Sequence, residues 1–164
     1  PIVYETCRLG RPVLISTGMS DDSAIDAAVG LADSRGCRAG LFQCTSEYPC
    51  PPEHLNLSTI RALEQRHGLP VGFSDHSSGI AMAPLAVAAG ARLIEKHVTF
   101  DKTRQGFDHP ISLSADEFAT MVAAVRLAEI VLGQPEKIAD KSVQQQAHLL
   151  SNCKNTSFVV LCGE

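Results

Sequence analysis

Four short apolar runs alternate with four helix-like stretches along the chain, and this repeat limits the folds open to it. The runs are expected to be strands that end at Ser16, Cys44, Ser74 and His97, in steps of 28, 30 and 23 residues. Because each step is long enough for a right-handed crossover through a helix, the repeat predicts a parallel sheet covered by helices. Four such units make either half of a (β/α)8 barrel or a small doubly wound sheet, and the repeat alone does not decide between them.

The stretches between the runs carry the signals that start and stop helices. Helices are expected at residues 20–35, 57–67, 79–89 and 114–132, and a glycine follows each of them. Ser114 and Glu117 stand at the spacing of a capping box, which marks the start of the last helix. No glycine-rich phosphate loop follows any of the runs, which argues against a nucleotide-binding, doubly wound fold.

The composition, with 45% hydrophobic and 20% charged residues, is that of an ordinary globular protein. The formal net charge of −4 argues against a nucleic-acid partner, because such a partner needs a basic surface. No apolar run approaches the roughly 20 residues that span a bilayer, and the chain opens with no signal peptide, so no membrane partner is expected. The six cysteines match no zinc-finger spacing, and we expect free thiols in a reducing cytoplasm.

The repeat occupies residues 1–138 and begins abruptly, without Met and in the middle of the pattern, so we expect a piece of a longer protein. Residues 139–164 follow no such pattern. They are expected to be a tail or linker, in which only residues 158–161 resemble a strand.

Polar residues collect where each expected strand ends and its loop begins. In parallel barrels the carboxyl ends of the strands form the active face. Side chains at positions i and i+2 of an extended segment point the same way. Three pairs should therefore share a face: Ser46 with Tyr48, Ser74 with His76, and Glu95 with His97.

Two histidines, His76 and His97, stand at the ends of the last two expected strands. If these strands are neighbours, about 4.8 Å apart, both imidazoles can reach one ion through bonds of about 2.1 Å. Two protein ligands leave coordination positions open for substrate and water, which suits a catalytic divalent metal. A lone histidine is more often a surface residue, and His54, His67 and His148 are interpreted in that way.

Two carboxylates lie close to the same expected rim. Asp108 belongs to the loop of residues 101–112, which also contains His109 and is otherwise interpreted as a polar surface loop. Asp75 alternates away from His76 and is expected either to support that imidazole or to cap the next helix.

Five segments of the chain resemble, in order and spacing, the successive motifs of the sialic acid synthase (N-acetylneuraminate synthase) family. They are residues 16–19, 44–49, 72–76, 95–99 and 108–113. The resemblance implies a (β/α)8 barrel, with this chain supplying its last four βα units. It also implies a transferase of carbohydrate biosynthesis, which condenses phosphoenolpyruvate with N-acetylmannosamine or a related amino sugar to give N-acetylneuraminate and phosphate.

The resemblance also implies roles for individual residues, position by position. His76 and His97 would hold a divalent metal ion, Mn2+ or Mg2+. Ser16, Ser46 and Ser74 would contact phosphoenolpyruvate, although some relatives carry Asn at the position of Ser46. Tyr48 and Asp108 would hold the sugar hydroxyls, so the implied catalytic set is His76, His97, Asp108 and Tyr48.

The family's first four barrel units lie outside this sequence, and so does the antifreeze-like domain that covers the partner's active site in the family's homodimer. We therefore expect the chain alone to be inactive. Three alternatives stay open: a legionaminic or pseudaminic acid synthase, a non-catalytic half-barrel remnant, and an unrelated aldolase barrel. The aldolase would need a Schiff-base lysine, for which Lys96 is the candidate, but alternation turns Lys96 away from the face of His97.

Overall fold

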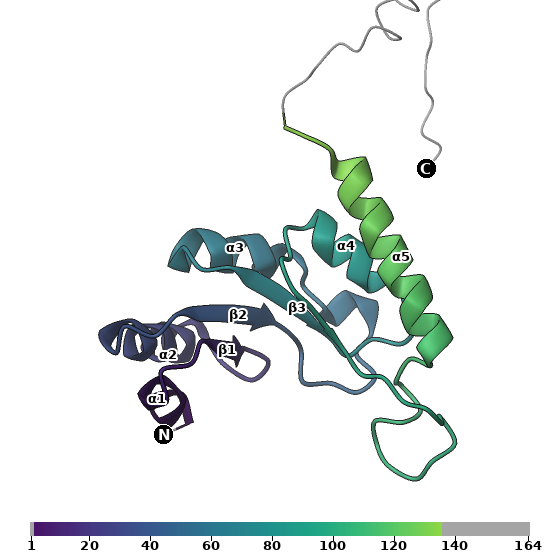
Figure 1. Cartoon of the computed structure of the whole chain (residues 1–164), viewed down its shortest axis with the longest axis horizontal. Helices are drawn as coiled ribbons and strands as arrows, with labels where there is room; N and C mark the ends of the chain where they lie inside the picture. The colour runs from purple at the N-terminus through teal and green to yellow at the C-terminus, as the bar shows by residue number, and fades with distance from the viewer. Residues whose placement is uncertain (1, 136–164) are drawn as a thin grey trace, which may run out of the picture. The chain divides into compact units, whose positions relative to one another are not determined.

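The sheet has four parallel strands whose spatial order follows the sequence, in a computed structural model that describes residues 2–135 (Figure 1). The strands are β1 (Val13–Ser16), β2 (Ala39–Gln43), β3 (Val71–Asp75) and β4 (Ile94–Lys96). A doubly wound sheet reverses its strand order at a switch point, whereas a barrel adds each strand beside the one before. The unreversed order is therefore that of a half-barrel, as one of the two sequence interpretations predicted.

In the described residues an α-helix follows each strand and one more precedes the first strand (Figure 1). The helices are α1 (Ile2–Arg8), α2 (Asp22–Ser34), α3 (Ser58–His67), α4 (Met82–Ala88) and α5 (Ala115–Leu132), with a 3-10 turn η1 (Pro52–His54) before α3. The four predicted helices are confirmed, although α4 begins later than expected. Helix α1 was not predicted from the sequence. Residues 139–164, interpreted above as a tail or linker, lie outside the described residues.

The ends of the helices explain why they form where they do. Asp21 caps α2, because its Oδ1 accepts a hydrogen bond from the Ala24 amide at 2.8 Å. Gly68 ends α3 in the left-handed conformation, with φ of 66°. At α5 the predicted capping box is confirmed: the Ser114 amide donates to Glu117 Oε2 at 2.7 Å, and the Glu117 amide donates to Ser114 Oγ at 3.3 Å.

The main core lies between the two central strands and the helices, and its largest member is Phe73, which is fully buried. Leu41 and Val71 contribute from the same strands, and Ile60 and Leu63 from α3. Burying one such side chain contributes roughly 1.5–3 kcal/mol. This core holds β2 and β3 side by side, and so brings the ends of β3 and β4 to the same rim.

A buried ion pair joins β3 to β4 on the face opposite the predicted site. Lys96 Nζ lies 3.0 Å from Asp75 Oδ2, with the two side chains 1% and 0% exposed. The two residues are direct partners in the strand register. Asp75 Oδ1 also accepts hydrogen bonds from the Ser77 amide at 2.8 Å and the Ser77 hydroxyl at 2.6 Å. Asp75 thus binds Lys96 and a local turn; the expectation that it caps the next helix was wrong, because α4 begins after Ala81.

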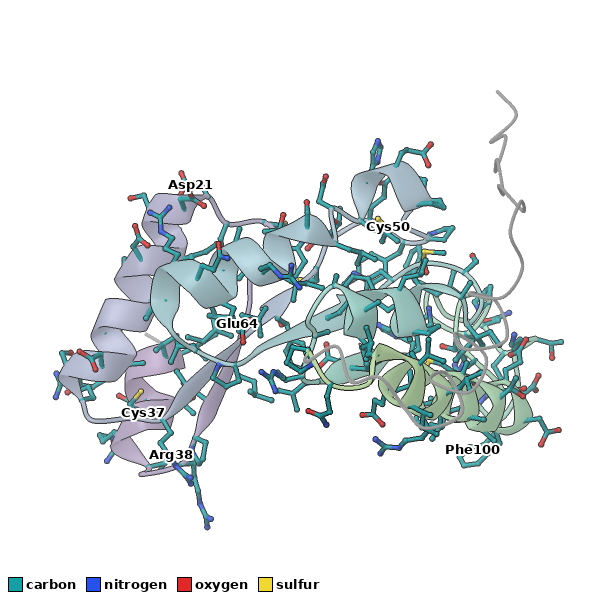
Figure 2. All side chains as sticks on the ribbon, turned by 90° about the horizontal axis from the view of Figure 1, so that it is seen from above. Asp21, Cys37, Arg38, Cys50, Glu64 and Phe100 are labelled. Atoms are coloured by element: carbon teal, nitrogen blue, oxygen red, sulfur yellow. The ribbon has the colours of Figure 1, made fainter. Side chains whose placement is uncertain are left out.

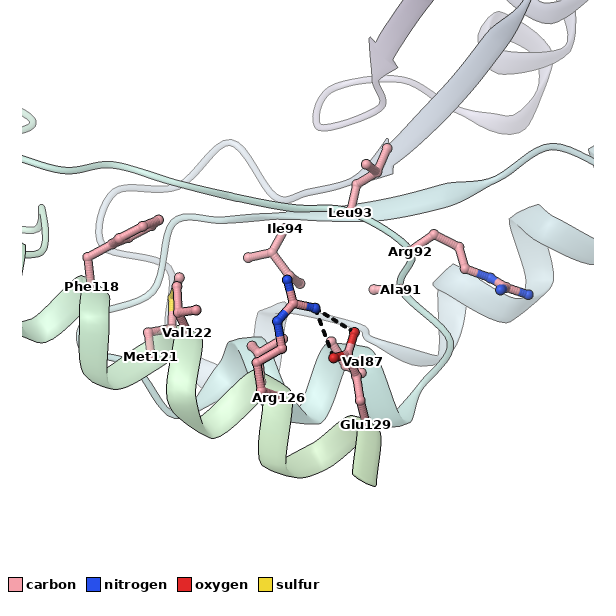
Figure 3. A pocket seen from close by; sticks show the side chains of 11 residues that line it. Val87, Ala91, Arg92, Leu93, Ile94, Phe118, Met121, Val122, Arg126 and Glu129 are labelled. Carbon is pink, nitrogen blue, oxygen red and sulfur yellow. Dashed lines mark hydrogen bonds and ion pairs between the residues drawn. The ribbon is translucent and has the colours of Figure 1, made fainter. Parts of the chain in front are cut away.

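A pocket of about 280 Å3 lies in the outer layer, between α5, the end of α4 and the β4 edge (Figure 3). Val87, Ile94, Phe118 and Val122 line it, and Arg126 binds Glu129 across its mouth (Figure 3). It is separate from the polar residues at the carboxyl ends of the strands. In the described part of the chain, no helix combines the length and the apolarity that crossing a membrane requires.

The buried pair generates a stability prediction for the variant Lys96→Met. Asp75 would keep its charge in the interior without its partner, so the free energy of unfolding should fall by about 3–5 kcal/mol. Arg8→Met is the matched control, because Arg8 binds Glu5 at the surface with both side chains more than half exposed; its cost should be at most about 1 kcal/mol. Urea unfolding measures both, and equal midpoints for the two variants would contradict the prediction.

Candidate functional site

His76 has hydrogen-bond partners at both ring nitrogens at the rim where the strands end. It is buried, and its Nδ1 lies 2.7 Å from the main-chain carbonyl of Thr45. A carbonyl oxygen only accepts, so Nδ1 carries the hydrogen and the Nε2 lone pair is available. Nε2 lies 3.2 Å from both the Tyr48 hydroxyl and Ser74 Oγ. The fold thus fixes both the tautomer and the direction of the ring.

Two hydroxyl groups and a carboxylate complete this side of the site. Ser74 Oγ donates to Glu95 Oε1 at 2.7 Å, which leaves the Tyr48 hydroxyl as the donor to His76 Nε2. The Tyr48 ring stacks on the His76 ring, with centroids 4.1 Å apart. Burial, with nearby negative charge from Asp108 and Glu95, raises the pKa of Tyr48 above its usual value, so the phenol stays neutral and able to donate.

His97 faces His76 from the neighbouring strand end. Ser74 and Glu95 are partners in the strand register, and each is followed two residues later by a histidine. The two histidines therefore lie side by side, with ring centroids 5.8 Å apart. Asp108 approaches from the following loop, with Oδ2 3.8 Å from His97 Nδ1. Five predicted residues are therefore brought together from two strand ends and two loops: Tyr48, Ser74, His76, His97 and Asp108.

Ser46 reaches the rim beside the loop after β1. A Cβ added at Gly18 would lie 2.4 Å from Ser46 Oγ and 2.9 Å from Cys44 Sγ, so these loops touch where only glycine fits. Cys44 is buried, and burial raises the pKa of its thiol. Ser16 ends β1, which is separated from β3 by β2, and it is exposed.

The imidazoles of His76 and His97 can bind one divalent metal ion if its other coordination positions are filled by further ligands. An imidazole centroid lies roughly 3.2 Å from a metal bound at about 2.1 Å, so two rings on one ion are at most about 6.4 Å apart. The separation of 5.8 Å between His76 and His97 lies within this limit. Within residues 2–135 no group of three or more His, Cys, Asp or Glu side chains could hold a metal, so further ligands would have to be substrate oxygens, water or groups outside these residues.

The sequence analysis missed several residues that organise this site. Glu95 was predicted to share a face with His97, but nothing in the sequence indicated that it accepts a hydrogen bond from Ser74. The Thr45 carbonyl, which orients His76, left no signal in the residue pattern. One surface interpretation was wrong: the His67 side chain is only 6% exposed, with Nε2 3.7 Å from Asp26 Oδ1. His54 is exposed as expected and binds Glu47 at 2.8 Å.

Two other expectations concern Lys96 and the cysteines. Lys96 is buried against Asp75 on the opposite face, which removes it as a Schiff-base candidate at this rim. Cys7, Cys37, Cys44 and Cys50 are free thiols, and three of them are buried.

Comparison with known proteins gives one consistent family. The NeuB family model matches residues 1–137. The uncharacterized protein MJ1065 of Methanocaldococcus jannaschii is 45% identical over 139 residues, which are 84% of this chain and 41% of that protein. N-acetylneuraminate-9-phosphate synthase of Homo sapiens is 39% identical over 84% of this chain and 38% of its own length. N,N'-diacetyllegionaminic acid synthase of Campylobacter jejuni is 34% identical over 92% of this chain and 46% of its own length.

A solved structure shows the same fold. The N-acetylneuraminic acid (sialic acid) synthetase of Leptospira borgpetersenii, crystallised with citrate, superposes with a TM-score of 0.84 at 34% identity. The match covers 93% of this chain and 53% of that one. The chain thus spans about two fifths to one half of the length of the proteins it resembles.

The contact at Gly18 generates a second prediction. Gly18→Ala should displace Ser46 and Cys44 and lower the free energy of unfolding by about 1–3 kcal/mol, as overpacking does. Gly30→Ala is the control, because Gly30 lies within α2 with no atom within 4 Å of an added Cβ. It should leave stability unchanged or raise it by up to about 1 kcal/mol. Urea unfolding compares the two, and a neutral Gly18→Ala would show that the loops are not in tight contact.

Proposed function

Because this chain belongs to the NeuB family of sialic, legionaminic and pseudaminic acid synthases, we propose that it forms the C-terminal half of a barrel that condenses phosphoenolpyruvate with an N-acetylated amino sugar. The first candidate for the sugar is open-chain N-acetylmannosamine, and the products are N-acetylneuraminate and phosphate. The observation that supports this most is the pairing of His76 and His97 at one rim, with hydroxyl and carboxylate side chains around them.

The reaction has two bond-forming steps. Carbon 3 of phosphoenolpyruvate attacks the aldehyde carbon of the sugar, and water adds to carbon 2. Phosphate then leaves from carbon 2, so one water is consumed for each phosphate released. The site must therefore bind two anionic groups, hold the sugar chain extended, and manage the protons of the aldehyde oxygen and the water.

The side chains of this chain divide these tasks. Ser16, Ser46 and Ser74 contact the oxygens of phosphoenolpyruvate, since hydroxyls bind anions without bulk; Ser16 and Ser46 donate directly, and Ser74 donates once its hydrogen is released from Glu95. The neutral Tyr48 phenol and the Asp108 carboxylate bind sugar hydroxyls, one as a donor and the other as an acceptor. Such bonds hold carbon 3 close to the aldehyde carbon. Bringing two reactants into this geometry accounts for a large part of the barrier of a bimolecular step.

Glu95 is the acceptor for protons on this face. Its Oε1 already accepts the Ser74 hydrogen at 2.7 Å. A carboxylate in this position can also take a proton from water that adds to carbon 2.

His76 and His97 would hold a divalent ion, Mn2+ or Mg2+, through neutral imidazole nitrogens. The Thr45 carbonyl keeps the hydrogen of His76 on Nδ1 and so keeps Nε2 free for this purpose. When bound, such an ion supplies Lewis-acid polarisation of the aldehyde oxygen.

A legionaminic or pseudaminic acid synthase is the second candidate, and the similarity to the Campylobacter jejuni legionaminic acid synthase favours keeping it. The chemistry is the same and only the sugar differs. Tyr48 and Asp108 would bind the sugar in either case, so the two candidate substrates differ only in other substituents of the sugar.

The test uses the full-length protein that contains this chain, supplied with phosphoenolpyruvate, Mn2+ and each candidate sugar in turn. Phosphate release and product mass should identify one sugar as the substrate. The chain alone should release no phosphate, because it provides half of the barrel. No release by the full-length protein with any of the sugars would overturn the proposal.

The metal assignment predicts the behaviour of two variants of that protein. His76→Ala and His97→Ala should each lower kcat at least about 100-fold and abolish the dependence on Mn2+, because each removes a metal ligand. His54→Ala is the control, since His54 is exposed and bound to Glu47, and should retain activity. Metal-dependent turnover that survives in either histidine variant would remove the assignment.

A further inference from the structure

We propose that His109 is a positioning residue: by its hydrogen bond to Thr99 it holds the loop of residues 101–112 closed, and so keeps Asp108 beside His97. The assignment of Asp108 to the sugar rests on the proposed function above. The closure of the loop by His109 and Thr99 does not, and it can be measured without any activity.

The two ends of this loop are joined immediately beside His97. The Leu113 amide donates to the His97 carbonyl at 2.9 Å, and the Thr99 amide donates to the Leu113 carbonyl at 2.9 Å. The loop therefore leaves from the strand end and returns to it. Anything that opens the loop moves side chains directly over the paired histidines.

Asp108 is fixed through its main chain but not through its side chain. Its carbonyl accepts hydrogen bonds from the Ser112 amide at 3.0 Å and the Ser112 hydroxyl at 2.6 Å. Its carboxylate is 61% exposed and lies 3.8 Å from His97 Nδ1, too far for a hydrogen bond. The side chain thus depends on the loop to keep it near the site.

His109 connects the middle of the loop to its start. Its Nδ1 lies 2.7 Å from Thr99 Oγ1, and Thr99 is buried. The Thr99 hydroxyl donates to the Asp101 carbonyl at 3.2 Å, so His109 Nδ1 is the donor in the bond between them. The ring also lies against Gly106, where an added Cβ would be 3.1 Å from His109 Cδ2. Through Nδ1 the His109 ring thus joins the middle of the loop to Thr99 at its start.

Other contacts that could hold the loop are weak. Phe100 and Phe107 are fully exposed, and Phe100 stands at the surface (Figure 2). Lys102 binds Glu117 of α5, but both side chains are more than one third exposed, so the pair contributes at most about 1 kcal/mol. The part-buried bond between His109 and Thr99 therefore ties this part of the loop to the strand end, in addition to the Ser112 bonds to the Asp108 carbonyl.

The loop contains its own reporter of opening. Lys102 and Arg104 are exposed trypsin sites within it. In the chain as it stands, His109→Ala and Thr99→Val should each speed cleavage after Arg104 about two- to tenfold, the range expected for loss of one neutral hydrogen bond. The double variant should be cleaved no faster than the faster single variant. His109→Asn, whose amide nitrogen can replace Nδ1, should restore slow cleavage, and Phe107→Ala should leave it unchanged.

The same variants test the positioning role in the full-length protein. His109→Ala should raise KM for the sugar about three- to tenfold, with KM for phosphoenolpyruvate unchanged, and His109→Asn should reverse the effect. Cleavage of His109→Ala at the wild-type rate would overturn the proposal. An increase in KM that His109→Asn does not reverse would also overturn it, because the imidazole itself would then act on the substrate. Absence of activity in the wild type would sink the proposed function, while the cleavage rates would still decide the role of His109.

Discussion

The ion pair between Asp75 and Lys96 fixes the register on which the candidate site depends. An unpaired charge in the interior lowers the stability of a protein. Sliding β4 along β3 by one residue would separate the pair and leave such charges, so this register is strongly favoured. The same slip would turn Glu95 and His97 to the helix side and leave Ser74 and His76 without partners. The pair lies on one face of two strands, and the site lies on the other, so stability on the outer face determines geometry on the inner one.

Much of the fold follows from the sequence because the repeat of strand, loop and helix leaves strong local signals. The alternation that placed Ser74 with His76 and turned Lys96 away holds in the structure, and so do the glycine stops and the capping box. Helix α1 was not predicted, because its seven residues carry no capping signal and are too few to show a helical pattern. The order of the strands needed the structure, since local patterns do not encode which strands pair.

The candidate site, too, could be predicted from the sequence only in part. Residue types at strand ends indicated His76 and His97, because strand direction places them with little freedom. The Thr45 carbonyl that orients His76 comes from a loop, and so does the bond between Thr99 and His109 that ties the loop of Asp108. Loop conformation is set by tertiary contacts, so no periodic pattern could predict these bonds. Family membership then supplies the chemistry, and the structure adds which atoms are free to perform it.

The hydrogen bond that orients His76 ends on a main-chain oxygen, and this has an evolutionary consequence. A point mutation at Thr45 changes a side chain and leaves the carbonyl in place, so the ring is insulated from most substitutions nearby. Ser46, on the same loop, can therefore vary while the Thr45 carbonyl still orients the imidazole. Such an arrangement lets side chains of this loop change by single substitutions without turning the ring.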